Sequence, residues 1–223
     1  MDSANEAVFY TSGRTSNEAS FLYQLFAKEF GTNNMPDCSN MCHETSGAAL
    51  RTTIGIGKGT VKLDDFYDTD LIIVIGQNPG TNAPRMLSAL EKGKKNGAKI
   101  IAINPLPEAG LMGFKNPQEI KGIIGSPVKL ADLYLPVKIN GDMALLKAIE
   151  ILLLEAEKKN PGKVFNHEFI HEKTTGYEAY LQQFDNYNFD ELAIQSGVSR
   201  ETIQQAATMI AIKNRIIVCW GMG

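Results

Sequence analysis

The sequence predicts an α/β fold in which helices cover both faces of a parallel sheet. Two apolar runs, LIIVIG at 71–76 and KIIAIN at 99–104, are typical of strands buried on both faces. A segment with helical periodicity joins them at 84–96, and a longer one at 142–158 follows a further apolar run. Because strands that alternate with helices pair in parallel, this order predicts a doubly covered parallel sheet.

Four segments precede the first of these strands. AVFY at 7–10 predicts a short buried strand, and 16–29 predicts a helix with four large apolar residues at helical spacing: Phe21, Leu22, Leu25 and Phe26. Residues 31–47 are rich in Asn, Pro, Asp, Ser and Gly and predict a loop. Residues 48–62 contain three glycines and give no clear prediction.

The elements from residue 71 onward follow from apolar runs and their turn residues. Gly97 ends the helix at 84–96, and Ser199 caps a helix with one apolar face. The predicted order is strand 71–76, helix 84–96, strand 99–104, strand 133–137, helix 142–158, the helix after Ser199, and strand 216–219.

Composition excludes several classes of protein. The net charge of −3 provides no broad basic field, so we expect no nucleic-acid partner. The longest apolar run, ALLKAIEILLLEA, is too short to span a bilayer, so no membrane-spanning segment is expected. Three cysteines cannot all pair within the chain, which favours free or ligating thiols in the cytoplasm.

The loops after the predicted strands are the candidate ligand site. In open parallel sheets such loops gather at the carboxyl edge, where nucleotides bind. The polar residues best placed there are Asn78, Thr81, Asn104 and Asp142. Each also has a purely structural interpretation, because Asn and Asp commonly serve turns and helix caps. No G-x-G-x-x-G motif follows the first strand.

The segment NNMPDCSNMCHETSG at 33–47 holds two of the three cysteines and His43. Cys42 could be a small buried residue, a chance neighbour of His43, or half of a redox pair with Cys38. A zinc site would need about four ligands, more than this segment supplies. Two other histidines, His167 and His171, have the spacing of one helix face, and Cys219 lies in a predicted core strand.

Several motifs, taken in order, resemble one family. They are SGRTSNEASFLYQLFAKEFGTNN, CSNMCHETSG, TDLIIVIGQNPGTNAPRMLSALEKGKKNGAKIIAINP, INGDMALL and WGMG. Together they resemble the middle of the molybdopterin oxidoreductase family, especially formate dehydrogenase alpha subunits and their formate-dehydrogenase-like relatives. The resemblance implies a Rossmann-like domain that binds a molybdopterin dinucleotide, formed by residues 41–223, with residues 1–40 belonging to a preceding domain.

The resemblance also implies roles for particular residues. Cys42 would be the molybdenum ligand and His43 a catalytic neighbour that relays a proton. The implied cofactor is molybdenum bis(molybdopterin guanine dinucleotide), and the residues implied to contact it are Gly76, Asn78, Thr81, Asn104 and Asp142. The pattern departs from close relatives at Thr81 and Asn104, where these often carry an acid, and at Leu106, where they carry Arg.

The implied parent is a much larger catalytic subunit that oxidises formate, or another small substrate, and passes electrons to an acceptor protein or subunit. A 4Fe–4S cluster in such a parent would lie outside this chain, which is then an internal piece, truncated at its carboxyl end and inactive alone. Two other hypotheses are a stand-alone nucleotide-binding α/β module and a redox-responsive interaction domain that uses Cys38 and Cys42.

Overall fold

The chain folds into two compact units, Met1–Thr60 and Val61–Gly221. The structure is a computed structural model that describes residues 3–12, 15–36, 40 and 42–221. Each unit is built around its own contacts. The second unit contains the sheet, and the first contains the Cys-His segment.

A four-stranded parallel sheet forms the centre of the second unit. Its strands are β1 (Leu71–Ile75), β2 (Lys99–Ile103), β3 (Leu133–Leu135) and β4 (Ile216–Trp220), in the order β3-β2-β1-β4. All three pairings are parallel, which confirms the predicted pairing of 71–75 with 99–103. β3 is shorter than the predicted strand 133–137 because Pro136 has no N–H to donate to a neighbouring strand.

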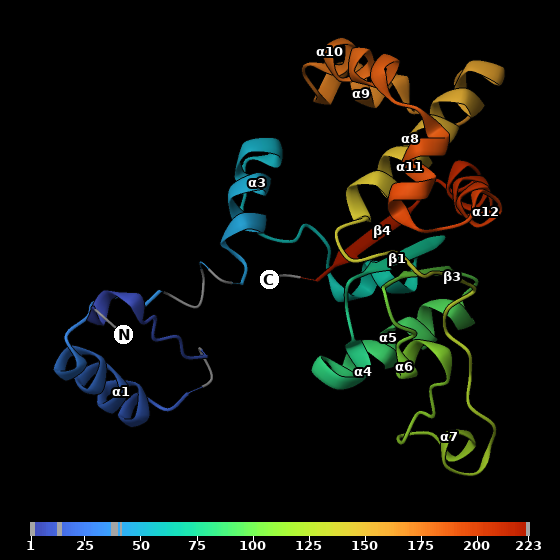
Figure 1. Ribbon diagram of the computed structural model, residues 1–223. Helices are drawn as coiled ribbons and strands as arrows, with labels where there is room; N and C mark the ends of the chain where they lie inside the picture. The colour runs from blue at the N-terminus through green and yellow to red at the C-terminus, as the bar shows by residue number, and fades with distance from the viewer. Residues whose placement is uncertain (1–2, 13–14, 37–39, 41, 222–223) are drawn as a thin grey trace. The chain divides into compact units, whose positions relative to one another are not determined.

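Three helices cover one face of the sheet (Figure 1): α8 (Asp142–Lys159), α11 (Phe189–Ser196) and α12 (Arg200–Ala211). Leu71, Ile73 and Ile101 point to this face. They share a core with the buried side of the three helices, including Leu145, Ala148, Leu192, Ile203 and Ala206. This confirms the predicted apolar face of the helix that follows Ser199, whose hydroxyl oxygen accepts the Thr202 N–H at 3.2 Å.

The opposite face is covered by α5 (Pro84–Lys95) and by the chain between β2 and β3. Ile72, Val74 and Ile100 alternate with the residues of the first face, as the two-residue period of a strand requires. Their core partners include Leu87, Leu90, Leu111, Phe114 and Leu130. Helices therefore lie on both faces of the sheet, as the sequence predicts.

The remaining elements are short or belong to the first unit. They are η1 (Ala4–Glu6), α1 (Asn17–Phe30), α3 (Glu44–Ile54), η2 (Leu63–Tyr67), α4 (Pro79–Asn82), α6 (Ala109–Met112), α7 (Ile120–Ile124), α9 (His167–Lys173), α10 (Tyr177–Gln182) and η3 (Gln183–Asn186). Within the described residues, no helix combines the length and apolarity needed to cross a membrane.

The first unit corrects two predictions. Residues 7–10 are not a strand: Phe9 donates one backbone hydrogen bond, to Asn34 O at 2.9 Å, and its ring packs on α1 with centroids 5.3 Å from Phe30. The segment 7–10 therefore packs against α1 through the ring of Phe9. The predicted loop 31–47 is too long, because α3 already begins at Glu44. α1 confirms the helix predicted at 16–29.

Candidate functional site

The loops after β1 and β4 meet at the carboxyl edge of the sheet. Gly221 N donates to Ile75 O at 2.7 Å, and a Cβ on Gly221 would lie only 2.3 Å from Gly76 O. Gly76 itself has a φ of 61°, in the left-handed region that favours glycine. Two glycines thus allow the two loops to approach more closely than larger residues would.

Side chains extend this contact to the loop after β2. Gln77 Nε2 donates to Trp220 O at 2.8 Å, and Asn104 Nδ2 donates to Gln77 O at 3.2 Å. Gln77, in the loop after β1, therefore contacts the end of β4 through its side chain and the loop after β2 through its carbonyl. Sequence patterns alone do not single out Gln77, because its role depends on a contact with a residue 143 positions away.

Asn104 is held by hydrogen bonds from three directions. Its N–H donates to Leu135 O at 3.2 Å, and its carbonyl accepts the Tyr134 hydroxyl at 2.5 Å. Its side-chain Nδ2 donates to Glu108 Oε1 at 3.1 Å as well as to Gln77 O. Both amide protons are thus engaged, which leaves Oδ1 as the side-chain atom that can accept a hydrogen bond from a ligand.

Two ionisable groups of this edge have shifted pKa values. Burial raises the pKa of the Glu108 carboxyl above its ordinary value. Burial, and then the nearby Glu108 charge, raise the pKa of the Tyr134 hydroxyl, which keeps it protonated as a donor. Sequence reasoning identified the loop that contains Glu108 but gave no role to the residue itself.

Asn78 and Thr81 have the structural role that the sequence offered as an alternative. The side chain of Asn78 accepts the Thr81 N–H at 3.2 Å and so caps α4. Gly80 packs against Gly110, where a Cβ on Gly80 would lie 3.3 Å from Gly110 Cα. This contact holds α4 beside α6, and therefore brings the loop after β1 close to the loop that contains Glu108.

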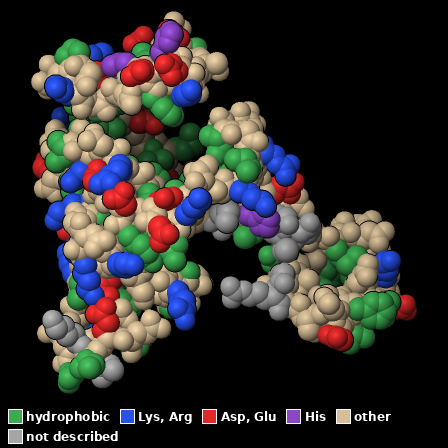
Figure 2. All heavy atoms as spheres, turned by 180° about the vertical axis from the view of Figure 1, so that it is seen from behind, with side chains coloured by type: hydrophobic (Ala, Val, Ile, Leu, Met, Phe, Trp, Pro, Cys, Tyr) green, Lys and Arg blue, Asp and Glu red, His purple; other side chains and the backbone are tan. Residues whose placement is uncertain are grey.

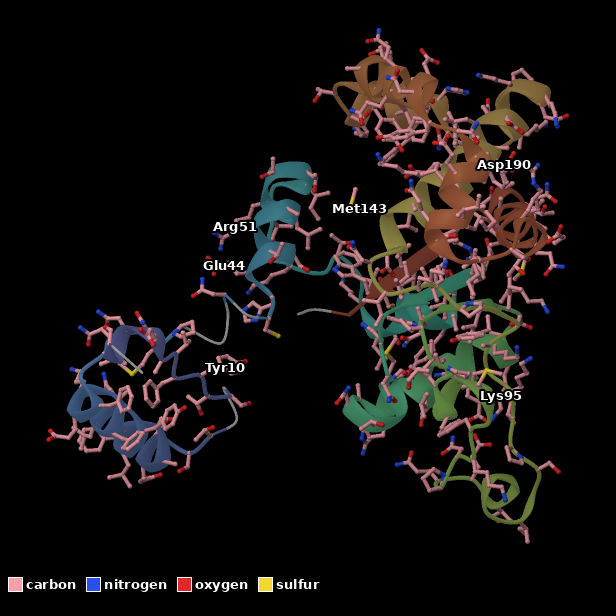
Figure 3. The ribbon with its side chains drawn as sticks, viewed as in Figure 1. Tyr10, Glu44, Arg51, Lys95, Met143 and Asp190 are labelled. Atoms are coloured by element: carbon pink, nitrogen blue, oxygen red, sulfur yellow. The ribbon has the colours of Figure 1, made fainter. Side chains whose placement is uncertain are left out.

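Asp142 lies in the first turn of α8 and is half-buried. The helix cap is Gly141, so the interpretation of Asp142 as the N-cap is wrong by one residue. Gly141 O already accepts the Leu145 N–H at 2.9 Å, so Asp142 is the first residue inside the helix. A Cβ on Gly141 would lie 2.9 Å from Lys138 O, which favours glycine at the cap. Figure 3 shows the neighbouring Met143 at this end of the helix. Among the described residues, no recorded hydrogen bond joins Asp142 to Gly76, Asn78 or Asn104.

Cys42 and His43 belong to the first unit and directly precede α3. Cys42 is a free, exposed thiol. His43 is the N-cap residue of α3, but its imidazole does not cap the helix; its carbonyl accepts the Gly47 N–H at 2.9 Å. Both side chains are therefore open to a ligand. Figure 3 marks Glu44, the next residue, at the start of the helix. Cys38 lies outside the described residues.

The other candidate residues have structural surroundings. Cys219 is half-buried in β4, where burial raises the pKa of its thiol to about 11, and this confirms it as a core strand residue. His167 and His171 are exposed on α9, and His167 Nε2 lies 2.7 Å from Glu157 Oε1. In the described part of the chain, no group of three or more His, Cys, Asp or Glu residues could hold a metal ion.

The charged side chains form no field of a single sign on the face seen in Figure 2, where acidic and basic groups are interspersed over the second unit. Several are paired, as Lys94 is with Asp132 at 2.7 Å. The surface of this face is therefore that of a protein without a broad electrostatic attraction for polyanions.

A parallel sheet whose loops gather at its carboxyl edge defines a class of α/β proteins that bind nucleotide-like groups there. The comparison with family models identifies the particular family. The model of the molybdopterin oxidoreductase family matches residues 2–223, and the chain belongs to that family. The family is one of molybdopterin-dependent oxidoreductases.

Relatives of known sequence span a range of similarity. An uncharacterized oxidoreductase of Mycobacterium tuberculosis (strain H37Rv) is 51% identical over 223 residues, which cover 100% of this chain and 29% of that protein. Formate dehydrogenase H of Escherichia coli (strain K12) is 29% identical over 214 residues, which cover 96% of this chain and 27% of the enzyme. The chain spans less than a third of the length of these relatives.

One solved structure shows the same fold. Acetylene hydratase from Pelobacter acetylenicus matches with a TM-score of 0.63 at 21% sequence identity. The match covers 88% of this chain and 23% of that enzyme. At this identity the likeness concerns the fold alone.

Proposed function

We propose that this chain is part of the catalytic subunit of a molybdenum bis(molybdopterin guanine dinucleotide) oxidoreductase that oxidises formate to CO₂. Residues 41–223 would bind the cofactor, and residues 1–40 would belong to the preceding domain. A protein or subunit would accept the electrons, and a 4Fe–4S cluster, where present, would be held outside this chain. The cytoplasm is the proposed location.

The observation that carries this proposal is the carboxyl edge of the sheet. Gly76 and Gly221 have no side chain, so the loops after β1 and β4 can lie in close contact. Asn104 and Glu108, hydrogen-bonded to each other, belong to the loop after β2. A guanosine carries several hydrogen-bond donors on its ribose and base. The acceptors Asn104 Oδ1 and the Glu108 carboxylate match these donors in kind. The residues present therefore fit a guanine dinucleotide.

The Cys-His pair fits the metal end of the same group. Cys42 offers an exposed thiol, and a deprotonated thiolate is a soft, strongly donating ligand for molybdenum. When bound, the cofactor supplies a metal that accepts the two electrons of formate oxidation. The imidazole of His43 makes no cap hydrogen bond to α3, and it would accept the proton that is released.

Formate is proposed as the substrate because formate dehydrogenase H is 29% identical over most of the chain. The relative at 51% identity is named only as an oxidoreductase. A different small substrate is therefore the second candidate. Both candidates use the same cofactor and the same Cys-His pair.

Purified full-length protein containing this segment tests the proposal. We expect about one molybdenum per full-length polypeptide. We also expect the protein to oxidise formate with an artificial electron acceptor. Metal content is measured by mass spectrometry and turnover by acceptor bleaching. Bound molybdenum without formate oxidation would reject the substrate and retain the cofactor assignment. Absence of molybdenum from active protein would reject both.

A further inference from the structure

We propose that the cavity between the end of α8 and the helical segment α9–α10–η3 binds a small organic ammonium ion with an apolar body, such as an aryl or alkyl amine. This inference does not rest on the proposed function. α8 has 18 residues and is therefore about 27 Å long. Asp142 lies in its first turn, and the cavity lies at its other end, away from the sheet (Figure 1). The cavity is thus separate from the candidate site.

The cavity has the size and the walls of a small-molecule site. Its volume is about 570 Å³, within the range of roughly 300–1,000 Å³ that is typical of ligand pockets. Half-buried aliphatic and aromatic side chains form its walls, among them Leu154, Leu181, Phe165, Tyr177 and Phe184. An apolar body bound there would remove this surface from water.

The charged groups around the cavity favour a cation. Among the described residues that line it are three carboxylates and one lysine: Glu155, Glu157, Asp185 and Lys158. Glu157 accepts hydrogen bonds from the loop that follows α8, and it keeps its charge while doing so. Glu155 and Asp185 are exposed, and neither makes a hydrogen bond or an ion pair with another described residue. Two carboxylates at the rim are therefore available to a ligand.

The charge of these carboxylates extends to the aromatic wall. Burial, and then the nearby charges of Glu157 and Glu178, raise the pKa of the Tyr177 hydroxyl. The same negative potential that disfavours a phenolate at this position favours an ammonium ion beside it.

One ring of the cavity wall already binds an ammonium group that belongs to the protein. Lys147 Nζ lies 3.7 Å from the centroid of the Tyr187 ring and donates to the Tyr187 hydroxyl. This distance is well within the roughly 6 Å over which a ring face attracts a cation. Tyr187 packs edge-on against Phe184, with ring centroids 5.8 Å apart. Lys147 is not among the residues that line the cavity, so its ammonium leaves the cavity open to a ligand.

Other kinds of occupant fit less well. An anion would meet three carboxylates against one lysine. An uncharged apolar group would cover the rings but would partly desolvate Glu155 and Asp185 without giving them a counter-charge, which costs free energy. An ammonium ion with an apolar body matches both the rings and the carboxylates.

The test uses the full-length protein that contains this segment and three probes that share one apolar body: phenethylammonium, phenethyl alcohol and hydrocinnamate. Dissociation constants are measured by calorimetry at neutral pH and low ionic strength, where exposed charges are least screened. The variant Glu155→Gln/Asp185→Asn removes both free carboxylates and keeps the side-chain shapes. The matched control Glu29→Gln/Asp64→Asn removes two exposed carboxylates that do not line the cavity. Thermal unfolding verifies that both variants are folded.

For the unchanged protein and the control, we expect phenethylammonium to bind about 10-fold more tightly than phenethyl alcohol, and hydrocinnamate to bind most weakly. In Glu155→Gln/Asp185→Asn the preference for the ammonium ion over the alcohol should fall to a few-fold, which the rings supply. The alcohol itself should bind as before, because the apolar wall is intact.

Three results would overturn the inference. The first is equal binding of the ammonium ion and the alcohol by the unchanged protein. The second is a preference for the ammonium ion that persists undiminished in Glu155→Gln/Asp185→Asn. The third is failure of all three probes to bind, which is the result expected if another segment of the full-length protein fills the cavity.

Discussion

Two cysteines of this chain show how surroundings decide what a residue can do. Cys219 is half-buried, and burial raises the pKa of its thiol to about 11, so it remains protonated and acts as a small apolar group. Cys42 is exposed in the turn before α3. The thiolate is the form that ligates metals, and the exposed Cys42 side chain is open to such a partner.

Substitution of Cys42 by Ser in the full-length protein should reduce turnover by orders of magnitude while the pterin stays bound. A hydroxyl is a harder, less donating ligand than a thiolate, and it loses its proton far less readily. Turnover, pterin content and the molybdenum spectrum are measured together. Cys219→Ser is the matched control and should keep the spectrum. An unchanged spectrum and full turnover in Cys42→Ser would show that another residue ligates the metal.

Substitution of His43 by Ala should slow turnover by about 10²–10⁴-fold if the imidazole is the general base. Metal ligation should persist, because the proposed ligand is the neighbouring thiol. The measurement is the pH dependence of turnover together with molybdenum content. His171→Ala, on the exposed face of α9, is the control and should leave both unchanged. A His43→Ala enzyme with normal turnover would remove the imidazole from the mechanism.

At the scale of elements, a single carboxylate fixes the end of α8 to the loop that follows it. Glu157 accepts backbone N–H groups from Gly162, Val164 and Phe165, and its Oε1 lies 2.7 Å from His167 Nε2. These bonds, that from Gly162 first, lower the pKa of the carboxyl to about 2. The loop and α9 are thereby held to α8 through charge rather than through a large apolar core.

The folded-state pKa of Glu157 lies below its ordinary value of 4.5, so its contribution to stability is complete above about pH 5. It should be lost as the pH falls through 4.5 toward 2. Glu157→Gln should lower the free energy of unfolding at pH 7 by roughly 1.5–3 kcal/mol and flatten this acid dependence. Urea unfolding at several pH values measures both. Glu155→Gln, exposed on the same helix, should behave like the parent chain.

The elements also show what the sequence could and could not predict. Strands β1 and β2 were predictable because runs such as LIIVI bury both faces, and that pattern has few alternatives. AVFY is also an apolar run, yet it forms no strand. Among the described residues no strand pairs with it, and the Phe9 ring packs on aromatic side chains of α1. The early end of β3 could have been predicted from Pro136. The prediction extended the strand to residue 137 because Pro136 lies inside an apolar run.

The candidate site divides in the same way. Glycines and caps such as Gly76 and Asn78 were predictable, because local backbone geometry selects those residue types. Gln77 and Glu108 were not, because their importance comes from hydrogen bonds to residues of other loops. The assignments of Cys42 and His43 remain predictions that the resemblance implies.

At the scale of the whole molecule, the chain covers 29% of its relative at 51% identity, which bears on how much of a cofactor site it supplies. We predict that the 223-residue chain alone binds GDP but holds little molybdenum and does not oxidise formate. A cofactor that bridges domains would lose several hydrogen bonds to charged groups, each of roughly 1.5–3 kcal/mol. Metal analysis and a formate assay on the chain test this, with the full-length protein as the control. Stoichiometric molybdenum would show that residues 41–223 suffice.

The position of β4 at the edge of the sheet has a practical consequence for solution behaviour. Its residues Ile216, Val218 and Trp220 share the face of Leu71 and Ile73, yet they remain 37–45% exposed. Among the described strands, β4 also has no neighbour on its outer side, so this edge of the sheet can template pairing with a strand of another chain. The chain should therefore associate increasingly at high concentration, and Val218→Lys, which places a charge on that edge, should raise its solubility limit.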